Sequence, residues 1–319
     1  MAKYITLIVA ALLAVIAVPA KAQLARTFVS ASGSDANNCD RPTPCRTFQH
    51  AHDNTLANGE ITVLDPGGYG AVTITKSISI VDDGVGEASI LVSGGGTGIT
   101  VNAGPASYVN LRGITIQGIG FGGGRGIRFQ QGYALTIENC VIRNHTLEGI
   151  LANVQSDSFL SVADTLVADN GGQGIWINPV NPGRVSATFN RVEVYDNSQN
   201  GFLLEGDQTS VGASAPIEAT ITDSVIGNNN GFGAIVESSQ TPVKLVLVHS
   251  AVLNNQGGGI STNGPAALAA VTESALSGNL TTWTAFSGSA LQSFGDNGVS
   301  FFNDDGGPPA PTPPTLVKE

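Results

Sequence analysis

A glycine followed by an apolar residue recurs about every 25 residues between residues 109 and 279, and this repeat constrains the fold more than any other feature of the sequence. The repeated pairs are Gly126-Ile127, Gly149-Ile150, Gly174-Ile175, Gly201-Phe202, Gly233-Ala234 and Gly259-Ile260, with successive spacings of 23, 25, 27, 32 and 26 residues. Self-similarity at a period of this size is typical of solenoid proteins. The repeat predicts a stack of similar units, each in contact only with its neighbours.

Each unit holds three short segments in which apolar and polar residues alternate, as in Leu135-Thr136-Ile137 and Ala219-Thr220-Ile221. Alternation with a period of two residues is typical of strands and does not suit a helix. Since one unit alone leaves its strand edges unpaired, the units must wind and stack about 4.8 Å apart. The sequence therefore predicts an all-β fold, a right-handed, single-stranded parallel β-helix.

Stacking turns equivalent positions of the units into columns. One column is expected to be small and inward-facing, and it contains Cys140, Thr165, Val192, Ser224, Ser250 and Ser274. A second is expected to form an asparagine ladder at a corner, because Asn and Asp tolerate a left-handed backbone and bond backbone N–H groups; it contains Asn144, Asp169, Asp196, Asn228 and Asn254. A third is expected to be a solvated ladder of charges, and it contains Arg112, Asp164, Arg191, Asp223 and His249.

The N-terminal residues 1–22 are predicted to be a secretion signal. Lys3 precedes an apolar run over residues 7–18, and Ala20-Lys21-Ala22 predicts cleavage before Gln23. No other membrane segment is expected. The chain is therefore expected to be exported, to the periplasm, the exterior or the cell surface.

The rest of the chain is expected to form a cap, a solenoid and a tail. Residues 23–60 are the predicted N-terminal cap, with a capping helix between Cys45 and Asn58 that covers the open end of the core. Residues 61–302 are the predicted β-helix, and the Pro-rich residues 303–319 are expected to be a disordered tail.

Two of the three cysteines, Cys39 and Cys45, flank a short loop that contains Pro42 and Pro44. In an oxidising compartment this pair predicts a disulfide. A metal site would need further Cys or His ligands, and only His50 and His52 lie near in the sequence, so the disulfide is favoured. No metal site and no cofactor is expected, and no motif supports Ca²⁺.

Several motifs resemble the secreted right-handed β-helix proteins of bacteria over residues 26–300. They are Pro44-Cys45-Arg46-Thr47-Phe48, Asp65-Pro66-Gly67-Gly68-Tyr69 and the Gly-Ile repeats. The resemblance implies the pectate-lyase-like fold of pectate lyases, polygalacturonases, alginate epimerases and phage tailspikes, and polysaccharide as the usual ligand. The catalytic patterns of these enzymes are absent: Asp82-Asp83 lacks the partner motifs of polygalacturonases, and Asp65-Pro66 is not followed by the His-Asp of alginate epimerases. Fold alone is a weak argument for function.

Two neighbouring columns supply the candidate site residues. Four residues after each repeated glycine lies an amide or an acid: Gln130, Asn153, Asn178, Glu205, Glu237 and Asn263. Glu205 and Glu237 are expected on adjacent units about 5 Å apart, close to the carboxyl separation of retaining glycosidases. Two residues earlier lies a column expected to face outward: Arg128, Leu151, Trp176, Leu203, Ile235 and Ser261. An exposed Trp beside amides and acids suits the stacking and hydrogen bonding of sugars.

Three functions fit these residues. The leading hypothesis is a polymer-binding protein without catalysis, which contacts carbohydrate or another surface polymer through Arg128, Trp176, Asn178 and Leu203. The first alternative is a polysaccharide hydrolase or lyase with Glu205 and Glu237 as its catalytic carboxylates, and the second is a structural or adhesive surface spacer. The apolar column is also open to interpretation as a homo-oligomer interface. A net charge of -11 argues against a nucleic-acid partner.

Overall fold

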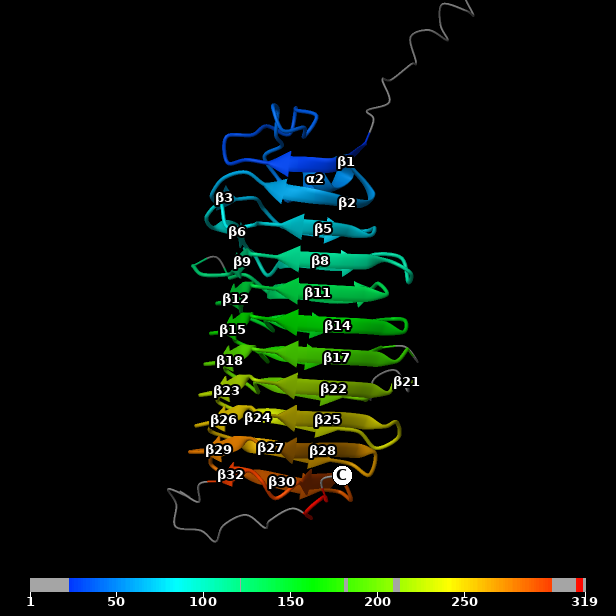
Figure 1. Cartoon of the computed structure of the whole chain (residues 1–319), viewed down its shortest axis with the longest axis vertical. Coiled ribbons are helices and arrows are strands. Elements are labelled where there is room, and N and C mark those ends of the chain that lie inside the picture. Colours follow the sequence, from blue (N-terminus) through cyan, green and yellow to red (C-terminus); the bar gives the residue numbers. More distant parts are fainter. Residues whose placement is uncertain (1–22, 121, 181–182, 209–212, 300–313, 318–319) are drawn as a thin grey trace, which may run out of the picture.

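The chain winds into an elongated parallel β-solenoid whose coils lie one above the other (Figure 1). The structure is a computed structural model, and it describes residues 23–120, 122–180, 183–208, 213–299 and 314–317. Three sheets run along the solenoid, and in each the strands of successive coils pair in parallel. The prediction of an all-β parallel β-helix is thereby confirmed. The predicted secretion signal lies outside the described residues.

We name the sheets A, B and C. Sheet A contains β1 (Leu24–Val29), β2 (Thr55–Val63), β5 (Ile78–Val81), β8 (Tyr108–Arg112), β11 (Ala134–Glu138), β14 (Ser158–Ala163), β17 (Val185–Asn190), β22 (Ile217–Thr222), β25 (Val243–Val248), β28 (Ala267–Thr272) and β31 (Ala290–Ser293). Sheet B contains β3 (Gly67–Gly68), β6 (Ala88–Leu91), β9 (Ile114–Gln117), β12 (Val141–Arg143), β15 (Leu166–Ala168), β18 (Glu193–Tyr195), β23 (Val225–Gly227), β26 (Ala251–Leu253), β29 (Ala275–Ser277) and β32 (Gly298–Val299). Sheet C contains β4 (Val72–Ile74), β7 (Thr97–Asn102), β10 (Arg125–Gln131), β13 (Ile150–Ala152), β16 (Ile175–Ile177), β19 (Phe202–Glu205), β24 (Phe232–Glu237), β27 (Gly258–Asn263) and β30 (Trp283–Phe286).

The core fills the inside of the solenoid with stacked apolar side chains, and the repeated Gly-apolar pairs supply one of its columns. The apolar member of each pair is buried and lies in register with its equivalent in the next coil; the column is Ile127, Ile150, Ile175, Phe202, Ala234 and Ile260. The period of the sequence is therefore the period of the core.

The asparagine ladder lies one residue after the predicted column. The predicted residues, such as Asn228 with a φ of 55°, do adopt the left-handed backbone expected of Asn and Asp. The stacked side chains are instead those of buried Asn170, Asn197, Asn229, Asn255 and Asn279, in which each Nδ2 donates to the next Oδ1 at 2.9 Å. The left-handed residue bends the chain at the corner, so that the following side chain points into the solenoid.

The repeated glycines lie directly against this ladder. A Cβ added to Gly174, Gly201 or Gly233 would lie 2.7–2.8 Å from the glycine carbonyl oxygen of the next coil and 2.9–3.0 Å from the Nδ2 of a ladder asparagine. Real Cβ atoms almost never approach backbone so closely. The glycines recur because each coil passes too near its neighbour here to admit a side chain.

The small inward column is confirmed, since all of its members are buried. Its serines form a second ladder, in which the backbone N–H of Ser224 donates to Ser250 Oγ and that of Ser250 to Ser274 Oγ, both at 3.1 Å. Burial raises the pKa of the Cys140 thiol to about 11, as expected for a small buried residue of this column.

The charged column is correct except at its first member. Asp164 accepts two hydrogen bonds from the Arg191 guanidinium at 2.6 and 2.7 Å, and Asp223 lies 2.6 Å from His249 Nδ1. Arg112 does not belong to this column, because it lies in register with Glu138, one residue earlier in the coil. All these pairs are exposed, so we expect them to contribute little to stability.

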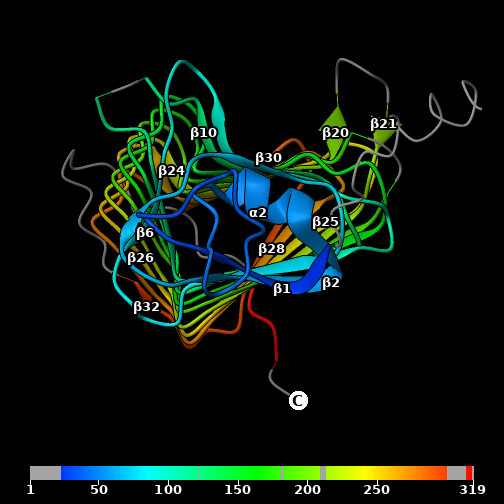
Figure 2. The ribbon, with the colours of Figure 1, turned by 90° about the horizontal axis from the view of Figure 1, so that it is seen from above.

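The N-terminal cap is smaller than predicted. Helix α2 (Phe48–Asn54) covers the end of the solenoid (Figure 2) and begins where the Thr47 hydroxyl accepts a hydrogen bond from the His50 N–H. It ends before Thr55, whose extended backbone starts β2, so Leu56 and Ala57 lie in a strand and not in the predicted helix. Because β1 pairs with β2, the solenoid begins at Leu24 and not at residue 61.

The C-terminal tail is not wholly without structure. Thr315 forms a parallel bridge with Ser293 of β31, and the Ser293 N–H donates to the Pro314 carbonyl at 3.0 Å. The expectation of a disordered tail is therefore wrong for residues 314–317, which cover the open edge of sheet A. Residues 303–313 and 318–319 lie outside the described residues.

His145 stands at the head of the asparagine ladder and predicts a pH dependence of stability. Burial lowers its pKa from 6.5 to about 4, and its Nδ1 is buried without a hydrogen-bond partner in the described structure. The unfolded chain therefore binds more protons between these pH values, so this contribution to stability is complete above about pH 6.5 and is lost as the pH falls towards 4. We expect a loss of about 1–2 kcal/mol between pH 6.5 and pH 5.

Denaturant titrations of the wild-type chain and of His145→Asn at several pH values measure this contribution. The variant removes the titrating group and leaves an amide suited to the ladder. As the pH falls, the unfolding free energy of the wild-type chain should decrease relative to that of His145→Asn. A difference that stays constant over this range would show that His145 does not titrate on unfolding.

Candidate functional site

The predicted carboxylate pair lies on adjacent coils of sheet C. Glu205 ends β19 and Glu237 ends β24, and the two residues are direct partners in the parallel register. Glu237 is in turn the partner of Asn263 on β27. The structure therefore brings together the acids that the sequence placed four residues after Gly201 and Gly233.

The two carboxylates differ in their surroundings. The pKa of Glu205 is raised, first by burial and then by the negative charge of Glu237, while Trp176 and Asn178 act in the opposite direction. Asn178 Nδ2 donates to Glu205 Oε2 at 2.6 Å. A raised pKa on one of two neighbouring carboxyl groups is a feature that general acids of this kind share. Two carboxylates fall short of the six to eight oxygen ligands that Ca²⁺ takes.

The adjacent column of Trp176 is much less exposed than predicted. Its members are in register across sheet C, as expected. However, Leu151 and Leu203 are only 6% and 9% exposed, and the Nε1 of Trp176 is buried. Arg128 is half-buried, and its Nε donates to Asn153 Oδ1 at 3.2 Å. The predicted stripe is therefore exposed only in part: Leu151, Leu203 and Ser261 are buried, whereas Arg128, Trp176 and Ile235 are partly exposed.

A β-hairpin leaves the solenoid between β19 and β22, and the structure describes the two strands at its base. Strand β20 (Asp207–Gln208) pairs antiparallel with β21 (Ala213–Ser214), and the two project from the outline of the solenoid (Figure 2). The base of the hairpin is held to the next coil, because the Asp207 carboxylate accepts hydrogen bonds from the Ser238 hydroxyl at 3.1 Å and from the backbone N–H of Ser239.

A separate hollow lies over the outer face of sheet A. It is a shallow groove of about 500 Å³ that spans five consecutive strands, from β11 to β25. Its floor is lined by two columns in register, first Thr136, Ser161, Thr188, Thr220 and Val246, and second Ala134, Phe159, Ser186, Glu218 and Lys244. Hydroxyl groups therefore recur along the groove at the spacing of the coils, about 4.8 Å.

An exposed stack of three aromatic rings borders this groove. The ring centroids of Tyr108 and Tyr133 are 5.1 Å apart, and those of Tyr133 and Phe159 are 5.2 Å apart. The three residues are 55%, 37% and 47% exposed, respectively, and Phe159 also lines the groove. Exposed rings beside a polar floor are what a surface needs to stack on sugars and bond their hydroxyls. Sequence reasoning did not select any of these residues.

A parallel β-solenoid with a lateral groove is the class of protein that these observations define. The chain belongs to a family within that class, because the family described as "Right handed beta helix region" matches residues 49–215, more than half of the 319 residues. The predicted right-handed parallel β-helix is thus confirmed. No curated protein sequence matches the chain.

Solved structures share this architecture at low sequence identity. Pectate lyase Pel9A is 16% identical, with 87% of this chain and 77% of that chain covered and a TM-score of 0.57. An alginate lyase from Paenibacillus sp. str. FPU-7 is 13% identical, with 82% and 98% covered and a TM-score of 0.48. The A-module of the mannuronan C-5 epimerase AlgE6 from Azotobacter vinelandii is 14% identical, with 86% and 87% covered and a TM-score of 0.39. These similarities concern the fold.

Proposed function

We propose that the chain is an exported protein that binds carbohydrate, or another extended surface polymer, along the groove of sheet A without catalysing its cleavage. The observation that carries this proposal is the exposed stack of Tyr108, Tyr133 and Phe159 at the border of the groove. Three large apolar rings left open to solvent in one place are uncommon on a protein that binds nothing.

The shape and chemistry of the groove favour a long ligand. It crosses five coils, and its floor offers hydroxyl groups from Thr136, Ser161, Thr188 and Thr220. Glu218 and Lys244 bring one charge of each sign, so the floor does not select strongly for a polyanion or a polycation. A neutral or weakly charged polysaccharide suits this floor best.

Export is supported by two observations. The Cys39–Cys45 disulfide is of the kind that persists in oxidising compartments. The residues 1–22 carry the sequence pattern of a secretion signal. In the part of the chain that the structure describes, no helix is long and apolar enough to cross a bilayer.

Tyr133→Ala is expected to weaken polymer binding by about tenfold, because Tyr133 is the central ring of the stack and contacts both neighbours. Affinity electrophoresis in gels with a panel of soluble neutral and acidic polysaccharides measures the effect. Trp176→Ala is the matched control from the predicted sheet C surface, and we expect it to leave retardation unchanged. Size-exclusion chromatography distinguishes an oligomer interface, since loss of a dimer in Tyr133→Ala without loss of retardation would contradict the proposal.

A second candidate function, hydrolysis of a polysaccharide, is favoured by the raised pKa of Glu205 beside Glu237. If the pair is catalytic, Glu205→Gln should reduce the release of reducing ends by at least a hundredfold, because it removes the general acid. Glu193→Gln is the matched control, since Glu193 is an exposed glutamate of sheet B, away from both candidate surfaces. Retention of full activity in both Glu205→Gln and Glu237→Gln would remove the pair as a catalytic site.

A further inference from the structure

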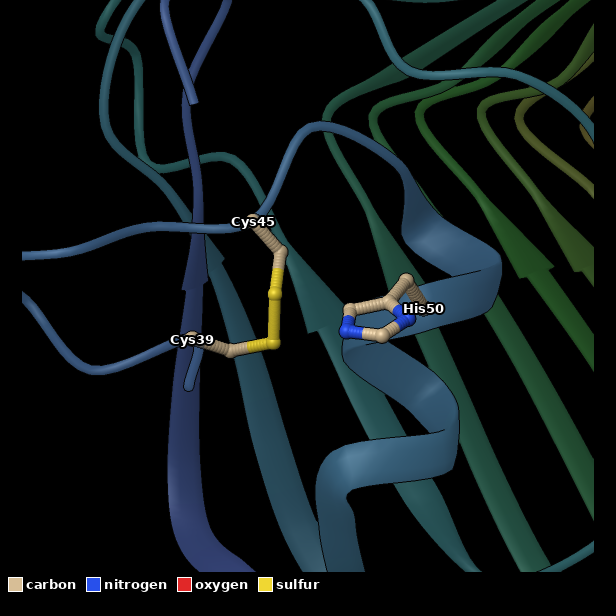
Figure 3. A group of neighbouring side chains, drawn as sticks. All are labelled: Cys39, Cys45 and His50. Atoms are coloured by element: carbon tan, nitrogen blue, oxygen red, sulfur yellow. A yellow bond between two sulfur atoms is a disulfide. The ribbon is translucent and has the colours of Figure 1, made fainter. Parts of the chain in front are cut away.

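Three metal-ligating side chains converge in the N-terminal cap, away from either candidate surface. The sulfur atoms of Cys39 and Cys45 and a ring nitrogen of His50 all lie within 4.8 Å of one another. Figure 3 shows the imidazole beside the disulfide, with the ring nitrogen farther from the backbone facing the two sulfur atoms. In the described residues, no other group of three His, Cys, Asp or Glu side chains comes this close.

The outer ring nitrogen of His50, Nε2, is the atom free to take a ligand. This nitrogen is buried and has no hydrogen-bond partner in the described structure, although burying a polar atom unpaired is costly. The backbone of His50 is fixed, because its N–H donates to Thr47 Oγ1 and its carbonyl accepts from Asn54 Nδ2 at 2.8 Å. The ring is thus held against the disulfide by the first turn of α2.

The other histidine of α2 has a separate role. His52 Nε2 accepts a hydrogen bond from the Thr75 N–H at 3.2 Å, and its Nδ1 lies 3.0 Å from the Asp53 carboxylate. Both of its ring nitrogens are therefore occupied in structural contacts. Only His50 leaves a nitrogen available to a ligand at the cysteine pair.

We propose that reduction of the Cys39–Cys45 disulfide opens a site for one Zn²⁺ ion, which the two thiolates and His50 Nε2 bind. A dithiol reductant transfers two electrons and two protons to the disulfide and is itself oxidised to a disulfide. Zn²⁺ then displaces the two thiol protons as it binds. In the reverse step a disulfide oxidant accepts two electrons from the two thiolates and is itself reduced to a dithiol, which reforms the Cys39–Cys45 bond and releases Zn²⁺.

The donor set and its position fit zinc. Two sulfur ligands and one imidazole are a common zinc set, and a water molecule completes the tetrahedron. Bonds of about 2.3 Å to sulfur and 2.0–2.1 Å to nitrogen place the ligand atoms roughly 3.5–3.8 Å apart. The nitrogen and the two sulfur atoms now lie within 4.8 Å of one another, so a small shift of the side chains meets this requirement. The two sulfur atoms must move apart by rotation of their side chains, because the backbone of both cysteines is held to β1: Cys45 forms a parallel bridge with Val29, and the Cys39 carbonyl accepts from the Phe28 N–H at 2.8 Å.

Titration of the reduced chain with Co²⁺ tests the proposal, because Co²⁺ substitutes for Zn²⁺ and absorbs visibly in a tetrahedral thiolate site. All samples carry Cys140→Ser, so that the only thiols are Cys39 and Cys45, and serine suits the ladder of Ser224 and Ser250 that the residue joins. We expect one Co²⁺ per reduced chain, displaced by Zn²⁺, and none in the disulfide form. His50→Gln should weaken binding by at least tenfold.

His249→Gln is the matched histidine control, since His249 is exposed and distant in the chain, and it should bind Co²⁺ as the parent does. Protection of both thiols from alkylation by Zn²⁺ gives a second readout that does not depend on colour. The proposal is overturned if the reduced chain takes up no stoichiometric metal, or if His50→Gln binds as tightly as the parent. A reduced cap that unfolds and binds metal through its two thiolates alone would also give the second outcome, because such binding would not need His50.

Discussion

Replacement of Asn229 by alanine is expected to lower the free energy of unfolding by about 3–5 kcal/mol, because it interrupts the asparagine ladder at its centre. The Asn229 side chain is fully buried. Its Nδ2 donates to Asn255 Oδ1 at 2.9 Å, and its Oδ1 accepts from the side chain and the backbone N–H of Asn197, at 2.9 and 3.1 Å. Alanine leaves these groups buried without partners, and each unpaired group costs about 1–3 kcal/mol.

Denaturant unfolding followed by circular dichroism measures the loss. Asn230→Ala is the matched control, since Asn230 is the next residue, carries the same side chain and is exposed. We expect its effect to stay within about 0.5 kcal/mol. Equal stability of the two variants would mean that water replaces the ladder amide at little cost, and would remove the ladder as a main source of stability.

The core could be predicted from the sequence, but the ladder could not be placed to the residue. The Gly-apolar repeat directly reports the inward column of Ile150, Ile175 and Phe202, because burial demands an apolar residue in every coil. At the corner, two polar residues such as Asn228 and Asn229 stand side by side in all ladder coils but the last, where Gly278 precedes Asn279. Residue type alone does not show which of the two side chains joins the ladder. The residue with the left-handed backbone turns the corner, and the next residue points its side chain into the solenoid.

The aromatic stack could not be predicted from equivalent positions of the repeat, because its three residues do not share one column. Tyr108 and Phe159 are both in register with Ala134, whereas Tyr133 is one residue earlier in its coil. The middle ring therefore reaches the stack from outside the column, and alignment of equivalent positions shows alanine between the two aromatics. The carboxylates Glu205 and Glu237 were found because they do share a column, although their neighbour Leu203 is more buried than alternation alone implies.

Gly233→Ala is expected to destabilise the chain by about 3 kcal/mol, against the usual small gain that alanine brings by restricting the unfolded state. The added Cβ would lie 2.5 Å from Val252 Cγ1, 2.8 Å from the Gly259 carbonyl oxygen and 3.0 Å from Asn255 Nδ2. The carbonyl belongs to the backbone of the next coil and cannot move without breaking the pairing of β24 with β27. The clash therefore strains the core, the sheet and the ladder together.

Gly68→Ala is the matched control for this prediction, because Gly68 also lies in a strand and a Cβ there would come no closer than 3.7 Å to its nearest neighbour, Ser89 Oγ. Thermal and denaturant unfolding of both variants beside the wild-type chain should separate them clearly, with Gly68→Ala within about 0.5 kcal/mol of the parent. If both variants unfold at the same denaturant concentration, the repeated glycines do not serve close approach of the coils. The period that defines the sequence would then need another physical cause.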